Sequence, residues 1–337
     1  MPGRPNGTFT EPDWFGIYLV FLLSIIFTII YFESKKTRIS NFQFPISNEF
    51  PIFKFLISNK INYVILTIVF VTLILTVSRS AWLGAAFVVI GFLKIILTNG
   101  QIKISKWNWR GFHYHISVIA LVVGVSLLIS TQLTNFQIFK RAQSTGGLQK
   151  ITVSCERRTS LNTESVIGNV SELSQYGCKF INLEEIEKEK SQGFNVFEIK
   201  RPDPTVGIRA QIYAKSIEQI KNNAIFGIGW GSISDILGKD ENGIGLNASN
   251  IFLETWLGSG VIGFLSLFVL FSYILIKSLV QYLSRHFEDK TPAVFASLGL
   301  FALVIPNLFN SGIFLGFLWI YIGVAISLVG ESIISKK

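Results

Sequence analysis

The sequence predicts an all-α polytopic membrane protein with about seven transmembrane helices and one large external loop. Half of its 337 residues are hydrophobic and only 15% are charged, whereas an average soluble domain carries about 25% charge. The apolar residues gather in seven runs, and one long segment of mixed charge separates the fourth run from the fifth. This composition excludes a soluble globular enzyme and a disordered protein.

Each apolar run is expected to form a helix, because a backbone that crosses lipid must satisfy its hydrogen bonds internally. The expected spans are 14–32, 61–77, 81–98, 112–130, 251–276, 292–309 and 312–330. They divide the chain into three regions. Residues 1–130 form a four-span membrane region, 131–250 an external loop domain, and 251–337 a three-span membrane region.

The positions of lysine and arginine predict the orientation of these spans. The connections on one side, together with the C-terminal tail and the adjoining Lys94, hold 14 basic and five acidic residues. The basic residues in the short connections on the other side are only Arg4 and Arg79. Cytoplasmic loops carry the excess of Lys and Arg. The basic side is therefore expected in the cytoplasm with the C-terminus, and the N-terminus outside. The net charge of +9 thus reflects membrane orientation, and no nucleic-acid partner is expected.

The large loop has the composition of a solvated external unit, with 14 basic and 13 acidic residues between 131 and 250. Loops of this length are usually functional. Both cysteines of the chain, Cys155 and Cys178, lie in it. In an oxidising exterior they could form a disulfide, or they could remain two separate thiols, since the sequence fixes no distance between them.

Three arginines on the external side are candidates for binding an anionic ligand. Arg79 lies in Ser78-Arg79-Ser80 between two spans, Arg209 opens an amphipathic stretch, and Arg4 precedes the first span. A guanidinium binds phosphate through a planar fork and stays charged at any physiological pH. The alternative for each arginine is contact with membrane lipid head groups. Together they favour an anionic, lipid-linked ligand.

Glu254 is an ionisable residue about one turn inside the fifth apolar run. Such residues are costly in a membrane and are candidates for function. The alternative is a structural hydrogen bond close to the interface. Gly258, Gly260 and Gly263 follow it and would allow close helix packing.

No cofactor and no metal are expected. The sequence has no two-histidine zinc pattern and no Asp-x-Asp pair. The glycine-rich stretch 226–232 follows a helical pattern rather than a strand, so a turn at the membrane surface is favoured over a nucleotide-binding loop.

With these residues identified, the chain resembles the O-antigen ligase and polymerase (Wzy/WaaL-type) superfamily over most of its length. Four segments match in the family's order: Arg4-Pro5-Asn6-Gly7-Thr8-Phe9 with Pro12-Asp13-Trp14; Ser78-Arg79-Ser80-Ala81-Trp82-Leu83-Gly84; Arg209 with Ala224-Ile225-Phe226-Gly227-Ile228-Gly229; and Ser249-Asn250-Ile251-Phe252-Leu253-Glu254 with Gly260-Val261-Ile262-Gly263. Family members usually have more spans before the first segment, so the chain is expected to be an N-terminally truncated member.

The resemblance implies a glycosyltransferase of the GT-C type in the bacterial inner membrane, which acts in cell-surface polysaccharide assembly. It would transfer a glycan from a polyprenyl-diphosphate carrier, such as undecaprenyl diphosphate, to an acceptor hydroxyl without a metal, as a ligase or a polymerase. Arg79 and Arg209 match the family's diphosphate-binding arginines, and Arg4, Ser249 and Asn250 are expected to contact substrate.

The family's catalytic histidine is replaced here by Ser249, whose hydroxyl cannot act as a base at neutral pH. Glu254 or another external carboxylate could substitute, the acceptor could need little deprotonation, or the chain could be a non-catalytic member or fragment. A further alternative is a small-anion transporter of the bicarbonate type. Transport is disfavoured because the spans carry almost no charge apart from Lys94 and Glu254 near their ends.

Overall fold

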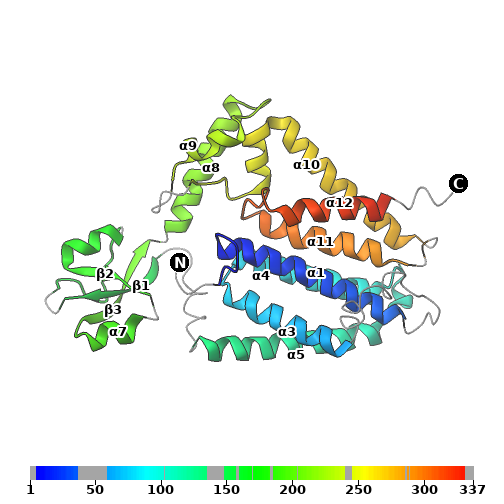
Figure 1. The fold of residues 1–337 in the computed structure, drawn as a ribbon, viewed down its shortest axis with the longest axis horizontal. Helices are drawn as coiled ribbons and strands as arrows, with labels where there is room; N and C mark the ends of the chain where they lie inside the picture. The colour runs from blue at the N-terminus through cyan, green and yellow to red at the C-terminus, as the bar shows by residue number, and fades with distance from the viewer. Residues whose placement is uncertain are drawn as a thin grey trace. The chain divides into compact units, whose positions relative to one another are not determined.

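The computed structural model is mostly helical and consists of two compact units, which are described separately here (Figure 1). One unit comprises residues 131–213 with the N-terminal four residues, and the other comprises 5–130 and 214–337. The structure describes residues 5–36, 59–101, 103–134, 148–156, 159–168, 170–182, 185–202, 204–239, 245–284, 287 and 289–330. The larger unit is called the membrane unit below, and the smaller one the sheet unit.

The membrane unit contains an apolar helix at the position of each expected span. The helices are α1 (Pro12–Lys36), α3 (Asn59–Leu75), α4 (Arg79–Thr98), α5 (Trp109–Leu133), α10 (Ile251–Leu283), α11 (Thr291–Asn307) and α12 (Gly316–Gly330). Within the described residues, four of them, α1, α4, α5 and α10, are long and apolar enough to cross a membrane, and the other three are shorter apolar helices. A helical membrane protein is confirmed, while the count of seven spans stays a prediction.

Helix α11 lies at the centre of the membrane unit and packs against α1, α4 and α10. Its buried face includes Ala293, Leu298 and Ala302. On the neighbouring helices the rings of Phe27 and Phe92 stack with their centroids 4.6 Å apart. This packing brings the beginnings of α4 and α10 to the end of α11, where the candidate site lies.

Helix α10 is broken at Gly260 rather than continuous. Gly260 has φ 67° and ψ −168°, a conformation that only glycine readily adopts. An unbroken helix of 33 residues would be about 50 Å long, much longer than the ~30 Å hydrocarbon core. The break leaves a short arm from Ile251 to Ser259, and the chain then turns sharply into the long segment that ends at Leu283 (Figure 1). Glu254 lies on this arm.

The sheet unit contains a three-stranded antiparallel sheet, so the all-α prediction was wrong for this part of the chain. Its strands are β1 (Leu148–Cys155), β2 (Cys178–Phe180) and β3 (Asn195–Pro202), in the order β2-β1-β3. The 3₁₀ helix η3 (Val170–Tyr176) and helix α7 (Ile186–Ser191) flank the sheet. Along β1, Ile151, Val153 and Cys155 alternate with polar residues and are buried. This period of two is typical of a strand, and the polar residues Thr152 and Ser154 on its other face are buried as well.

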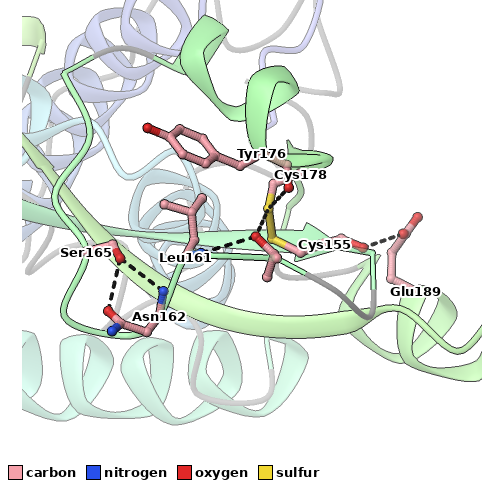
Figure 2. Close-up of a disulfide and its surroundings, with 9 residues drawn as sticks. Cys155, Leu161, Asn162, Ser165, Tyr176, Cys178 and Glu189 are labelled. Atoms are coloured by element: carbon pink, nitrogen blue, oxygen red, sulfur yellow. Dashed lines mark hydrogen bonds between the residues drawn. A yellow bond between two sulfur atoms is a disulfide. The ribbon is translucent and has the colours of Figure 1, made fainter.

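Cys155 and Cys178 form a disulfide, which decides between the two alternatives that the sequence left open (Figure 2). The two residues are direct partners in the register of β1 and β2. The bond therefore fastens the short β2 to the central strand of the sheet.

Replacing both cysteines by serine is expected to destabilise the sheet unit by about 3 kcal/mol, because the open chain regains the conformational freedom of a loop of this length. Thermal unfolding of the purified protein, with and without a reducing agent, measures this loss. Unchanged unfolding of the double variant would contradict the expectation.

The carboxylate of Glu189 also links the elements of the sheet unit, through a hydrogen bond and an ion pair. The hydroxyl of Ser154 donates to Glu189 Oε2 at 2.7 Å, and Lys179 Nζ donates to Glu189 Oε1 at 2.9 Å. The hydrogen bond from Lys179, followed by that from Ser154, lowers the pKa of the Glu189 carboxyl. The carboxylate therefore links β1, β2 and α7.

Helix α8 (Pro204–Asn222) follows β3, and the boundary between the two units falls inside it, after Tyr213. The expected loop domain ended at 250, and residues 214–250 belong to the membrane unit. They include η5 (Trp230–Ser232) and α9 (Ile233–Leu237). The division into three regions stays a prediction.

Candidate functional site

Arg79 is the first residue of α4 and projects from a tight turn that joins it to α3; residues 76–80 are called the Arg79 hairpin below. Val77 turns the chain with a positive φ of 51°. The hydroxyl of Thr76 accepts from Ser78 N at 3.3 Å, and the indole of Trp82 donates to Leu73 O at 3.0 Å. These bonds hold the turn from both sides.

Neighbouring helices also pack closely against the first turns of α4, directly after the Arg79 hairpin. A side chain on Gly84 would place its Cβ 2.5 Å from Pro306 of α11, and one on Gly16 would place it 2.8 Å from the Cβ of Ala81. Both glycines therefore permit a helix contact that no larger residue allows. From the connection after α11, Asn310 Nδ2 donates to Ser80 Oγ at 2.7 Å.

The side chain of Arg79 is exposed although its backbone is fixed. Among the described residues, no carboxylate forms an ion pair with it. It also lies at the N-terminus of a 20-residue helix, where the helix dipole favours negative charge. A rigidly mounted guanidinium in this setting is suited to binding an anion.

Ser249 and Asn250 shape the turn that begins α10; residues 247–250 are called the α10 turn below. Ser249 has a positive φ of 50° and its N–H donates to Asn247 Oδ1 at 2.8 Å. Asn250 caps the helix, since its Oδ1 accepts from Phe252 N at 2.9 Å and from Leu253 N at 3.1 Å. Ser249 thus lies in a defined turn with a strained backbone.

Glu254 holds the same turn from within the helix. Its carboxylate is buried, with 4% of the residue exposed, and Oε2 accepts a hydrogen bond from Ala248 N. This contact provides the structural role that the sequence offered as one alternative. It also fixes the carboxylate at the backbone of Ala248, the residue before Ser249.

The Arg79 hairpin and the α10 turn are brought together by the connection between α11 and α12. Asn310 reaches Ser80 in the hairpin, and Asn250 Nδ2 donates to Leu308 O at 2.9 Å. Asn307 holds the connection itself, because its Oδ1 accepts from Gly312 N at 2.8 Å. Sequence reasoning missed Asn307 and Asn310; two asparagines three residues apart at the end of an apolar run were the available signal.

The segment 224–228, which overlaps the glycine-rich stretch 226–232, forms a turn that fills the break in α10. Ile228 N donates to Leu257 O at 2.7 Å, and Val261 N donates to Ala224 O at 2.8 Å. The broken helix frees these two backbone groups, and a buried group left unpaired would be costly. A Cβ on Gly227 would lie 2.4 Å from Leu257 O, so only glycine permits this approach.

Two other candidate residues lie outside the membrane unit or outside the described residues. Arg209 is half-buried on α8, in the part that belongs to the sheet unit. Arg4 lies outside the described residues. Its predicted contact with substrate, and the predicted meeting of Arg79 with Arg209, stay predictions. In the described part of the chain, no three His, Cys, Asp or Glu side chains gather as ligands for a metal.

Comparison with known families agrees with the motifs. A family model described as O-antigen ligase matches residues 64–268, more than half of the chain. The matched range contains Arg79, Arg209 and the α10 turn, and it ends before Asn307 and Asn310. No curated protein and no solved structure matches the chain. The family and the apolar helices together indicate a bacterial inner-membrane protein.

Proposed function

Because the chain belongs to the O-antigen ligase family, we propose that it transfers a glycan from a polyprenyl-diphosphate carrier to an acceptor hydroxyl. The observation that carries the proposal is Arg79: an exposed guanidinium without an ion-pair partner among the described residues, on a backbone that α1, α11 and Asn310 hold in place. The partners are the lipid-linked glycan, a glycan or lipid acceptor, and the surrounding membrane lipids.

In the proposed reaction the acceptor oxygen attacks the anomeric carbon, and the bond from that carbon to the diphosphate oxygen breaks. The diphosphate leaves with the bonding electrons, and the acceptor proton passes to a base. Negative charge therefore develops on the leaving group in the transition state, where pre-positioned cations lower the barrier. In the proposal, Arg79 and Arg209 supply the positive charge that stabilises the leaving diphosphate, so that no metal is required.

The proposal includes an external location for the reaction. The excess of lysine and arginine on the opposite connections supports it. The disulfide of the sheet unit supports it too, because disulfides persist in oxidising compartments. Ser249 and Asn250 would contact substrate from the α10 turn.

Glu254 is the proposed base toward the acceptor, and a carboxamide in its place separates this role from the structural one. A glutamine at 254 can still accept the hydrogen bond from Ala248 N but cannot take a proton. If Glu254 is the base, the Glu254→Gln variant is expected to transfer glycan at least about 100-fold more slowly, with unchanged thermal stability. If the rate stays the same, Glu254 only holds the turn.

Arg209→Ala tests the second diphosphate contact. We expect the purified variant to release undecaprenyl diphosphate from an undecaprenyl-diphosphate-linked oligosaccharide about 100-fold more slowly than wild type, because one preorganised cation is lost from the transition state. Lys215→Ala is the matched control, since Lys215 is an exposed cation on the same helix.

The same preparation tests the proposal as a whole. Glycan transfer with release of undecaprenyl diphosphate supports it. Uptake of labelled bicarbonate into proteoliposomes, without any such release, would instead establish the transporter alternative. Equal rates in wild type, Arg209→Ala and Lys215→Ala would remove Arg209 from the site.

A further inference from the structure

A cavity of about 520 Å³ lies at the opposite end of the membrane unit from the Arg79 hairpin. It is lined by the end of α1, the beginning of α3, the end of α4 and the beginning of α5. Helix α4 begins at Arg79 and its 20 residues span about 30 Å. The cavity is therefore a separate site, and its size is typical of small-ligand pockets, which enclose about 300–1,000 Å³.

Two cations line this cavity. Lys35, near the end of α1, donates to the side chain of Asn99 and lies 5.5 Å from the centre of the Tyr31 ring. Arg110, in the first turn of α5, is exposed. Asn108 caps that turn by accepting from Gly111 N at 3.1 Å, so the positive end of the α5 dipole also faces this region. The cations and the helix end together favour a phosphate group.

An acid and aromatic rings line the same cavity. Glu33 is buried, with 6% of the residue exposed, and Tyr31, Tyr63 and Tyr114 lie around it in the lining. A carboxylate disfavours a ligand that carries only negative charge. Carboxylates and tyrosine rings both attract a primary ammonium, the first by charge-assisted hydrogen bonds and the second by cation–π contact.

The cavity lies at the depth where lipid head groups are found. Trp109, at the beginning of α5, is 49% exposed, and its ring lies 5.9 Å from that of Trp107. Exposed tryptophans and tyrosines at helix ends mark the boundary between hydrocarbon and water. A ligand in this cavity is therefore at the level of the phospholipid head groups.

We propose that this cavity binds the phosphoethanolamine head group of a membrane phospholipid, with the phosphate at Lys35 and Arg110 and the ammonium at Glu33 and the rings of Tyr63 and Tyr114. The pairing of two cations with a buried acid fits a head group that carries both signs of charge. Basic pockets between membrane helices bind lipid head groups in general. This inference does not depend on the proposed glycan transfer.

Native mass spectrometry of the purified full chain tests the proposal with phosphatidylethanolamine, phosphatidylglycerol and phosphatidylcholine. Phosphatidylethanolamine is expected to bind about tenfold more tightly than the other two, the effect of about one charge-assisted hydrogen bond. Arg110→Gln should weaken its binding, and Glu33→Gln should remove its advantage over phosphatidylglycerol. Lys103→Gln, which replaces an exposed lysine outside the lining, should leave the binding of phosphatidylethanolamine and its advantage over phosphatidylglycerol unchanged.

Two further measurements keep the result unambiguous. Water-soluble glycerophosphoethanolamine should compete with the bound lipid, whereas failure to compete would assign the binding to the acyl chains and overturn the proposal. Equal binding of all three lipids by wild type would overturn it as well. Because Arg110 is exposed, its variant is expected to fold, and an unchanged thermal unfolding curve verifies this.

Discussion

Arg79→Ala is expected to reduce glycan transfer by about 100- to 1,000-fold, the cost of losing one preorganised group that stabilises charge in a transition state. The fold should survive, because the side chain is exposed and the Arg79 hairpin is held by Thr76, Trp82 and Asn310. Release of undecaprenyl diphosphate by the purified variant, together with its thermal unfolding, measures both effects.

Two variants make the Arg79 result specific. Lys94→Ala removes an exposed cation near the other end of the same helix and should leave transfer unchanged. Arg79→Lys retains the charge without the bidentate fork and should recover only part of the rate. If Arg79→Ala transferred glycan at the wild-type rate, the proposed role of the Arg79 side chain would be refuted.

Gly260→Ala is expected to destabilise the membrane unit by at least about 4 kcal/mol, a large effect for a single substitution. The new Cβ would lie 1.9 Å from Ile225 O and 2.4 Å from Ile225 C, both backbone atoms. The φ of 67° adds a strain of about 1–3 kcal/mol. To relieve the contact, the 224–228 segment must leave the break, and its hydrogen bonds with Leu257 and Val261 are lost.

Gly323→Ala is the matched control for Gly260→Ala. Gly323 lies in the middle of α12, and a Cβ there would meet no atom within 4 Å. This variant should be unchanged or slightly more stable, because alanine favours a helix by up to about 1 kcal/mol over glycine. Thermal unfolding in detergent compares the two variants. Equal unfolding temperatures would show that the break does not require glycine.

The apolar helices could be predicted because their signal is local. Charge-free runs of sufficient length specify helices in lipid whatever they pack against, and every expected run contains one. The break at Gly260 could not be predicted in the same way. It depends on pairing with 224–228, more than 30 residues earlier in the chain. Gly258, Gly260 and Gly263 were interpreted as a helix-packing surface. Gly260 instead faces the backbone of Ile225 and Phe226, and Gly258 faces the ring of Trp230.

In the candidate site, the functional side chains could be predicted more readily than the hydrogen bonds that hold them in place. Arg79 and Glu254 are identified by residue type and by their positions beside apolar runs, and Ser249 and Asn250 by the family resemblance. The hydrogen bond from Asn310 to Ser80 joins positions 230 residues apart, and no pattern in the sequence encodes that contact. For the sheet, the alternation over 194–199 indicates the strand β3. The pairing of the strands could not be predicted, because β1 has partners only after β2 and β3 have folded back on it.

The discontinuity in α10 has a consequence for how the protein is made. Ala224 and Ile228 precede Leu257 and Val261 in the chain, so their hydrogen-bonding groups leave the ribosome first. At about 5–20 residues per second, the helix that needs them follows within seconds. The segment 224–228 is thus already synthesised when the broken helix reaches the bilayer. The unpaired backbone groups of Leu257 and Val261 therefore need not enter the hydrocarbon without hydrogen-bond partners.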